Sequence, residues 1–304
     1  MTKSTLNYPS SSQKTIKKAV SFSGQGVFTD AAAKITLYPA DVDTGVVFVV
    51  KGTLIPALAE YTQQKIQGFT ALQNENAKVQ TVEHLLSALY ALSVDNVRIE
   101  VEGSEIPMLD GSAKPFVEGL LNTGFSAQLK ERSVWEPKVP LMYETKEATL
   151  IALPSDTFRI SYTWHYPRSK TFQTQFASFE VSSQNFCEEI CAARTFAFYE
   201  DLLPAIEAGL IQGANLDQGV LIQEDAVVNK EGLRFQDELV RHKVLDLIGD
   251  FSLIGQRANV HLVALRSGHR DNVAFARQIR NILTGEISHG STIRQADLGC
   301  ESSR

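Results

Sequence analysis

Apolar residues recur at helical spacing in two parts of the chain, and each part leads into an alternating segment. Over residues 82–92 the leucines fall at the three- and four-residue intervals of one helix face, and residues 96–101 then alternate apolar and polar as in a half-buried strand. In the second half, residues 242–254 repeat the helical pattern and residues 260–265 the strand pattern. The pattern therefore predicts the order helix, loop, strand twice.

The two copies share few features in sequence. Each has a histidine near the start of its helix and an asparagine just before its strand, Asn96 in one and Asn259 in the other. The connecting loops differ in length, so internal duplication is a hypothesis that rests on two matched features. It places a division in the proline-containing stretch 132–140, and we expect two domains, residues 1–131 and 132–304.

Other segments complete a mixed pattern. Residues 13–51 are typical of strands joined by tight turns, with a buried strand at 46–50. Gly24-Gln25-Gly26 lacks the third glycine and the following helix of a dinucleotide-binding loop, so it predicts a turn. Residues 185–210 indicate helix, kinked or ended at Pro204. The duplicated helix-strand order predicts an α+β fold, with a small β-sheet and helices on one face in each of two similar domains.

Composition narrows the function classes. A chain of 304 residues that is 43% hydrophobic can bury a large core, and its net charge of −6 argues against a nucleic-acid binder. The apolar helical stretch from His84 to Leu92 is too short to cross a bilayer, and residues 1–12 are polar rather than signal-like, so we expect a cytoplasmic protein whose polar ends are disordered.

The three cysteines do not suggest a disulfide framework. Cys187 and Cys191 lie one helical turn apart, and Cys300 lies in the polar tail that begins at Gly285. Without further cysteine or histidine nearby, reduced and half-buried thiols are favoured over a metal site.

The segment from Arg241 to Asp250 carries the strongest chemical signal. His242, Asp246 and Asp250 recur every four residues and would lie along one helix face. An imidazole and a carboxylate one turn apart can bind one metal ion, but a catalytic zinc usually takes three protein ligands, and Thr81-Val82-Glu83-His84 could supply the third. The alternative is an exposed pair on a solvated helix face.

Six motifs in a fixed order favour the metal site over that alternative. Over residues 13–282 the chain resembles the UDP-3-O-acyl-N-acetylglucosamine deacetylase family, zinc amidases at the committed step of lipid A biosynthesis. The motifs are Thr81-Val82-Glu83-His84, Glu105-Ile106-Pro107-Met108-Leu109-Asp110-Gly111-Ser112-Ala113, Ala193-Arg194-Thr195-Phe196, Gly232-Leu233-Arg234-Phe235, His242-Lys243 with Asp246 and Asp250, and Ser267-Gly268-His269.

The resemblance implies a metal site and the groups that act around it. Zinc, or Fe²⁺ in its place, would be bound where the two domains face each other, with the helices packed between the two sheets as in a sandwich. Glu83 would accept a proton from the attacking water. A protonated His269 would stabilise the oxyanion or pass a proton to the departing amine, and Asp250 would orient His269. The implied metal ligands are His84, His242 and Asp246.

The resemblance also implies a substrate and the residues that contact it. The substrate would be a UDP-linked, acylated amino sugar, and the protein would act as a monomer without stable membrane insertion. The Thr195 hydroxyl and the Lys243 charge would stabilise the oxyanion. Trp164 and Phe196 would pack against the nucleotide-sugar, with Arg266 near the diphosphate. Three apolar residues would line the passage for the acyl chain or belong to the core: Leu202, Leu210 and Ile211.

The chain departs from the family pattern at two places. Phe28 stands where the family often has histidine, and Gly213-Ala214-Asn215 replaces a Gly-Gly-Ser loop, so the departures bear on substrate contacts and on the shape of the acyl pocket.

A non-catalytic, zinc-containing protein that binds UDP-sugars or acyl lipids is the main alternative function. A metal-independent α+β scaffold is a third.

Overall fold

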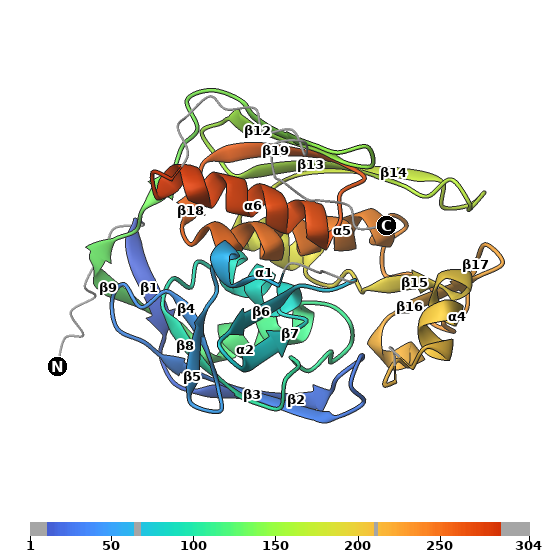
Figure 1. Cartoon of the computed structure of the whole chain (residues 1–304), viewed down its shortest axis with the longest axis horizontal. Helices are drawn as coiled ribbons and strands as arrows, with labels where there is room; N and C mark the ends of the chain where they lie inside the picture. Colours follow the sequence, from blue (N-terminus) through green and yellow to red (C-terminus); the bar gives the residue numbers. More distant parts are fainter. Residues whose placement is uncertain (1–10, 64–67, 210–211, 287–304) are drawn as a thin grey trace.

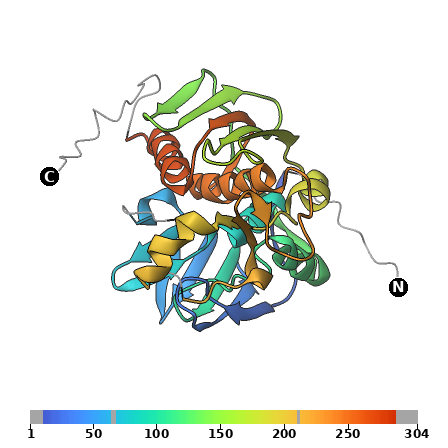
Figure 2. The ribbon, with the colours of Figure 1, turned by 90° about the vertical axis from the view of Figure 1, so that its right-hand side faces the viewer.

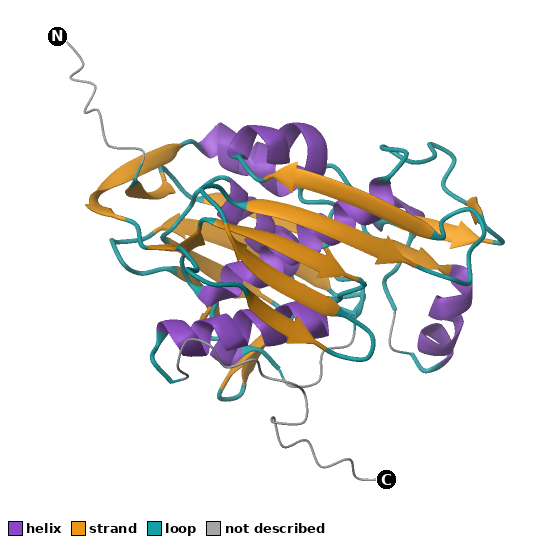
Figure 3. Cartoon of the chain, turned by 90° about the horizontal axis from the view of Figure 1, so that it is seen from above, coloured by secondary structure: helices purple, strands orange, loops and turns teal. Residues whose placement is uncertain are grey.

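Two five-stranded sheets form the outer layers of the molecule, and helices lie between them (Figure 1). The computed structural model describes residues 11–63, 68–209 and 212–286. The predicted disordered ends, apart from residues near their inner boundaries, lie outside the described residues, as do Cys300 and His289 in the tail. The same layer order is visible from the side in Figure 2, and Figure 3 shows the strands of the second sheet lying over the helices. The predicted α+β class is confirmed.

The two sheets have the same strand order. In each, the last strand along the chain lies in the centre, antiparallel to one neighbour and parallel to the other. This shared topology supports the duplication more strongly than the sequence did. The first sheet has the order β2 (Val20–Gln25), β3 (Ala32–Pro39), β8 (Val97–Glu102), β4 (Val46–Val50), β5 (Thr53–Pro56). The second has β11 (Leu141–Glu144), β12 (Thr149–Pro154), β19 (Val260–Leu265), β13 (Arg159–His165), β14 (Thr174–Glu180).

The division at residues 131/132 stays a prediction. What favours it is a change of strand partner at that point. Strand β9 (Phe125–Glu131) pairs with β1 (Ser12–Ile16), whereas β10 (Val134–Trp135) pairs with β18 (Arg257–Ala258) near the second sheet. The chain thus leaves the first half and joins the second within a few residues.

Four helices fill the space between the sheets: α1 (Glu83–Ala91), α2 (Lys114–Thr123), α5 (Glu238–Phe251) and α6 (His269–Leu283). All nine residues of α1 are buried, as are twelve of the fourteen in α5, because these two helices pack on each other as well as on their sheets. Gly249 permits the close approach, since a Cβ at this position would lie 2.1 Å from the carbonyl oxygen of Glu83. The contact brings the start of α1 against the C-terminal part of α5.

The helix predicted over residues 185–210 was wrong in part. After α3 (Ser183–Asn185) and a π-helical turn (Phe186–Ile190), the chain forms strand β15 (Phe196–Phe198) and then α4 (Tyr199–Glu207). Strand β15 pairs in parallel with β16 (Val220–Gln223), which pairs with β17 (Ala226–Val227), so a partner distant in sequence overrides the local pattern. Helix α4 also continues through Pro204, which loses only one backbone hydrogen bond there.

The structure also describes the segments of two smaller predictions, the glycine turn and the cysteines. Gly24 and Gln25 end strand β2, and the turn follows at residues 27–29, three positions later than the glycine pattern predicted. Cys187 is partly buried and Cys191 buried, both as free thiols. Within the described part of the chain, no helix is long and apolar enough to cross a membrane.

Candidate metal centre and catalytic site

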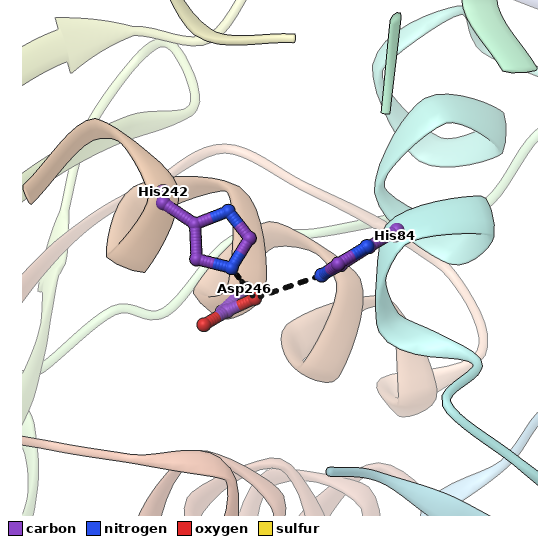
Figure 4. Close-up of side chains that lie close together, drawn as sticks. All are labelled: His84, His242 and Asp246. Carbon is purple, nitrogen blue, oxygen red and sulfur yellow. Dashed lines mark ion pairs between the residues drawn. The ribbon is translucent and has the colours of Figure 1, made fainter. Parts of the chain in front are cut away.

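The closest packing of α1 and α5 brings three potential metal ligands together. His84 is the second residue of α1, and His242 and Asp246 lie one turn apart on α5. The Nε2 atoms of His84 and His242 lie 3.6 and 3.3 Å from the same oxygen, Oδ1 of Asp246 (Figure 4). All three side chains are buried, and one ligand atom from each lies within 4.8 Å of the others. The alternative of an exposed pair on a solvated helix face is therefore wrong.

The hydrogen bonds around this triad are incomplete in a way that fits a cation. Asp246 Oδ2 accepts from Lys243 Nζ at 2.9 Å, but Oδ1 is buried without a hydrogen-bond partner among the described residues. Burial lowers the pKa of His242 to about 3, so its imidazole is neutral. Its Nδ1 lies 3.1 Å from the carbonyl oxygen of Ala193, which favours the tautomer with a lone pair on Nε2. Electron pairs thus converge on one point without a donor, as a divalent metal requires.

The charge state of Asp246 suits the same purpose. Burial favours its neutral form, but His242, Lys243 and His269 outweigh burial and hold the pKa of Asp246 well below its usual range. The carboxylate is therefore ionised at any pH at which the protein would work, and an ionised carboxylate is a metal ligand.

Glu83 lies beside the triad because it directly precedes His84. It is 2% exposed, and its Oε2 accepts a hydrogen bond from the backbone N–H of Thr70 at 3.0 Å. Its Oε1 lies 3.9 Å from Nε2 of His269. Burial raises the pKa of Glu83, against the opposing effect of His269 and His84. A carboxylate with a raised pKa at a polar centre is suited to accept a proton.

His269 opens α6 on the other side of the centre. Its Nδ1 lies 2.9 Å from Oδ2 of Asp250, and its Nε2 lies 3.7 Å from Oδ2 of Asp246. Burial on its own lowers the pKa of His269, but Asp250, Asp246 and Glu83 outweigh burial and raise the pKa to about 9. The imidazole is therefore charged near neutral pH and can donate a proton. Oδ2 of Asp250 also accepts from Nδ2 of Asn272 at 3.0 Å.

A cavity of about 1260 Å³ opens onto these groups. Thr195, Phe196, Lys243 and Arg266 line it close to the centre. Its arm toward α4 and β16 is mainly apolar, and Leu202 lies there; the other residues of that arm are Ala197, Tyr199, Ile206, Leu216, Val220 and Leu221. The cavity thus joins a polar centre to a mainly apolar space.

One of the predicted substrate contacts does not line the cavity, and another lies outside the described residues. Trp164 is 7% exposed and does not line the cavity; it packs edge-to-face behind Phe196, with ring centroids 5.5 Å apart. Ile211 lies outside the described residues, as does Leu210. Lys243 reaches over the face of Phe196, 5.3 Å from its ring centroid, so the aromatic ring and the ammonium group hold each other in place.

The two other described histidines, His165 and His261, lie away from the centre. His261 Nε2 is 2.9 Å from Ser161 Oγ on the outer face of the second sheet, and His165 Nδ1 is 2.8 Å from Thr174 Oγ1 at its end. Neither lines the cavity.

Both departures from the family pattern lie next to the cavity. Phe28 packs against Phe69, with ring centroids 4.3 Å apart and the ring planes tilted by 50°, and both residues line the cavity. Glu105 holds this turn by accepting from the backbone N–H groups of Phe28 and Thr29, each at 3.1 Å. In the second departure, Asn215 Oδ1 caps a short turn through the N–H of Asp217 at 2.9 Å.

Thr70 and Asn272 are site residues that the sequence did not indicate. Neither belongs to the motifs that carry the family resemblance, and each is a common polar residue with no distinctive spacing. Only the fold brings their side chains to Asp250.

Known proteins resemble this chain over most of its length. A sequence model of one family, described as LpxC: UDP-3-O-acyl N-acetylglycosamine deacetylase, matches residues 13–281. A protein of Chlamydia pneumoniae named UDP-3-O-acyl-N-acetylglucosamine deacetylase is 39% identical over 276 residues, covering 89% of this chain and 98% of the relative. Proteins of the same name from Chlamydia abortus and Chlamydia trachomatis serovar L2 are each 40% identical, covering 89% and 90% of this chain and 98% and 96% of the relatives.

Proposed function

The chain belongs to the UDP-3-O-acyl N-acetylglycosamine deacetylase family, and from this we infer that it is a metal-dependent hydrolase. It cleaves the N-acetyl group of UDP-3-O-acyl-N-acetylglucosamine to give UDP-3-O-acyl-glucosamine and acetate, the committed step of lipid A biosynthesis. The observation that carries this proposal is the convergence of the metal-ligand triad, a buried carboxylate and a charged imidazole on one cavity with an apolar arm. The family resemblance further leads us to propose a cytoplasmic monomer.

His84, His242 and Asp246 would hold the metal, and their two nitrogens and one oxygen suit Zn²⁺, with Fe²⁺ as a second possibility. A bound dication would polarise the amide carbonyl and lower the pKa of a water molecule. The incomplete hydrogen bonding of Asp246 Oδ1 supports this assignment.

Glu83 and His269 would move the protons. Glu83 accepts a proton from the water as the water oxygen bonds to the amide carbon. His269 stabilises the oxyanion that forms, or it donates a proton to the amine as the C–N bond breaks. Asp250 keeps the imidazole oriented and charged through the 2.9 Å hydrogen bond to Nδ1.

Residues along the cavity would bind the rest of the reactant. The Thr195 hydroxyl and the Lys243 ammonium group stabilise the oxyanion, and Phe196 packs against the sugar. Arg266 offers a planar guanidinium to the diphosphate. The apolar arm around Leu202 receives the 3-O-acyl chain. A non-catalytic, zinc-containing binding protein is not favoured, because binding alone needs neither a buried base nor a charged imidazole at the centre.

Metal content and acetate release from UDP-3-O-acyl-N-acetylglucosamine, measured on the same samples, test the proposal. We expect about one metal ion per chain with turnover in the wild type, and loss of both in His242→Ala, because two ligands bind a metal far more weakly than three. His261→Ala is the matched control, since His261 lies on the outer face of the second sheet and should leave both values unchanged. Metal without turnover in the wild type would support the binding protein instead.

A further inference from the structure

We propose that Thr70 is a positioning residue that holds the proton acceptor and the proton donor of the site in register with each other. This inference rests on the proposed function, because it concerns how Glu83 and His269 act together. Thr70 is not a metal ligand and does not itself line the cavity; it contacts Glu83 and Asp250, and its hydroxyl oxygen also lies 3.4 Å from Nδ1 of His269.

Thr70 contacts Glu83 through its backbone and Asp250 through its side chain. It is fully buried; its backbone N–H donates to Oε2 of Glu83 at 3.0 Å, and its hydroxyl donates to Oδ1 of Asp250 at 2.5 Å. The residue directly precedes β6 (Ala71–Asn74), which forms a hairpin with β7 (Ala77–Gln80). Its carbonyl oxygen accepts from the N–H of Val82 at 3.3 Å, which fixes Thr70 to the start of α1.

The hydroxyl contact completes the hydrogen bonding of Asp250. Oδ2 of Asp250 accepts from His269 and Asn272 at 2.9 and 3.0 Å, and Oδ1 accepts from Thr70. A carboxylate held at both oxygens cannot rotate without losing a hydrogen bond, and rotation would carry Oδ2 away from the imidazole. Thr70 therefore restricts the direction in which His269 points.

The contact also joins two parts of the chain that are distant in sequence. Asp250 and His269 come from α5 and α6, whereas Thr70 and Glu83 come from the β6–β7 hairpin and α1. Proton donor and acceptor must both face one reacting amide, and misplacement of such groups by about 1 Å can cost about 100-fold in rate. One residue that bonds to both sides sets their relative position.

Thr70→Val separates the two contacts. Valine keeps the branched shape and the backbone N–H to Glu83 but removes the hydroxyl that reaches Asp250. We expect kcat per folded molecule to fall about 10- to 100-fold while KM stays within about twofold and the metal content is unchanged. Thr70→Ser keeps a hydroxyl and should restore kcat to within about threefold of the wild type. A residue that serves packing alone would not show this split between kcat and KM.

Thr123→Val is the matched control. Thr123 is also a buried threonine, 7% exposed, whose hydroxyl donates at 2.8 Å, but its acceptor is the carbonyl oxygen of Gly119 in α2. Removing this hydroxyl should leave kcat unchanged, so an equal loss in both variants would overturn the proposal.

A double-variant cycle tests the path of action. Since Thr70 acts through Asp250, the loss caused by Thr70→Val should largely disappear when Asp250→Asn is already present. Full multiplication of the two losses, or wild-type kcat in Thr70→Val, would overturn the role of Thr70 while leaving the deacetylase proposal standing. A wild type that binds metal but releases no acetate would overturn both.

Discussion

Two clusters of charged residues each include a buried carboxylate of α5, and they differ in how completely the hydrogen bonds of that carboxylate are made. The arginine cluster is Arg194, Glu231, Arg234 and Glu238; the catalytic cluster is Glu83, His84, His242, Asp246, Asp250 and His269. Glu238 is fully buried, and its carboxylate accepts from the N–H and the guanidinium of Arg194 and from the N–H of Arg234, at 2.6–3.1 Å. Two turns further along the same helix, Asp246 keeps one buried oxygen without a partner among the described residues.

This difference shows that burial of charge does not by itself mark a functional site. In the arginine cluster each guanidinium nitrogen of Arg194 meets an acceptor, including Glu231 at 2.7 Å and the carbonyl oxygen of Gly232 at 2.7 Å. Such a network fixes the chain around Thr195 and gives both buried oxygens of Glu238 hydrogen-bond donors. In the catalytic cluster, Nε2 of His84 and Nε2 of His242 face Oδ1 of Asp246 without a hydrogen bond, which stabilises the structure little and leaves room for a cation.

The sharpest test of the comparison exchanges one buried glutamate for glutamine in each cluster. Glu83→Gln keeps the shape and the hydrogen bond from Thr70 but removes the proton acceptor. We expect turnover to fall by about 10²- to 10⁴-fold, equivalent to about 3–5 kcal/mol of barrier, with metal content and the unfolding midpoint nearly unchanged. Acetate release, metal analysis and thermal unfolding measure these three quantities.

Glu238→Gln is the matched variant in the arginine cluster. It leaves the charge of Arg194 poorly compensated, so the unfolding midpoint should fall, while acetate release per folded molecule falls far less than in Glu83→Gln. If the two variants lost activity equally, the separation of a structural cluster from a catalytic one would be wrong.

The second test removes the cation of the arginine cluster. Arg194→Met would leave the fully buried Glu238 without its partner, and breaking a buried ion pair in this way costs about 3–5 kcal/mol of unfolding free energy. Denaturant unfolding measures this loss. The control is Arg159→Met, because Arg159 pairs with Glu180 at 3.8 Å on the surface and such pairs contribute about 1 kcal/mol or less. Equal losses in the two variants would mean that the arginine cluster is not the stabilising element inferred here.

The sequence predicted those parts of the fold in which local pattern and packing agree. Residues 260–265 form β19 as predicted. The helix predicted over residues 242–254 is found as α5, which begins four residues earlier at Glu238, followed by a 3-10 turn (Ser252–Ile254). These segments bury one face or are buried on all sides, and the spacing of their apolar residues can be recognised within the segment itself. Strand β15 was missed because its partner β16 lies more than twenty residues away, and nothing near residues 196–198 indicates that pairing.

The candidate site shows the same limit at the level of single atoms. The four-residue spacing treats Asp246 and Asp250 alike, and both are buried on the same helix. They differ only in their partners: Asp250 accepts from Thr70, His269 and Asn272, whereas Oδ1 of Asp246 meets two imidazole nitrogens. Apart from His242, which lies on α5 itself, those partners come from three other segments, so their convergence depends on the tertiary fold. The family resemblance proposed roles for both carboxylates, and the geometry supplies a physical reason for the difference.

The third test asks whether the negative charge of Asp250 shifts the pKa values of other groups in the catalytic cluster. The expected effect is a shift of the pH profile, and a shift of one pKa unit corresponds to about 1.4 kcal/mol. Asp250 raises the pKa of His269, which reaches about 9, and favours the protonated imidazole. Asp250→Asn removes the charge, so the pKa of His269 falls and the imidazole loses its proton at lower pH. The alkaline limb of kcat/KM should therefore move to lower pH.

The acidic limb sharpens this test, because Asp250 also raises the pKa of Glu83 by charge repulsion, although burial raises it more. Without that repulsion, Glu83 ionises at lower pH, and the acidic limb should move in the same direction as the alkaline limb but less far. Profiles of kcat/KM from about pH 5 to about pH 10 for the wild type and Asp250→Asn decide the matter. An alkaline limb that stays in place would mean that Asp250 acts by hydrogen-bond geometry alone. Asp250 would then resemble Glu238, and the boundary between the two clusters would lie between Asp246 and Asp250.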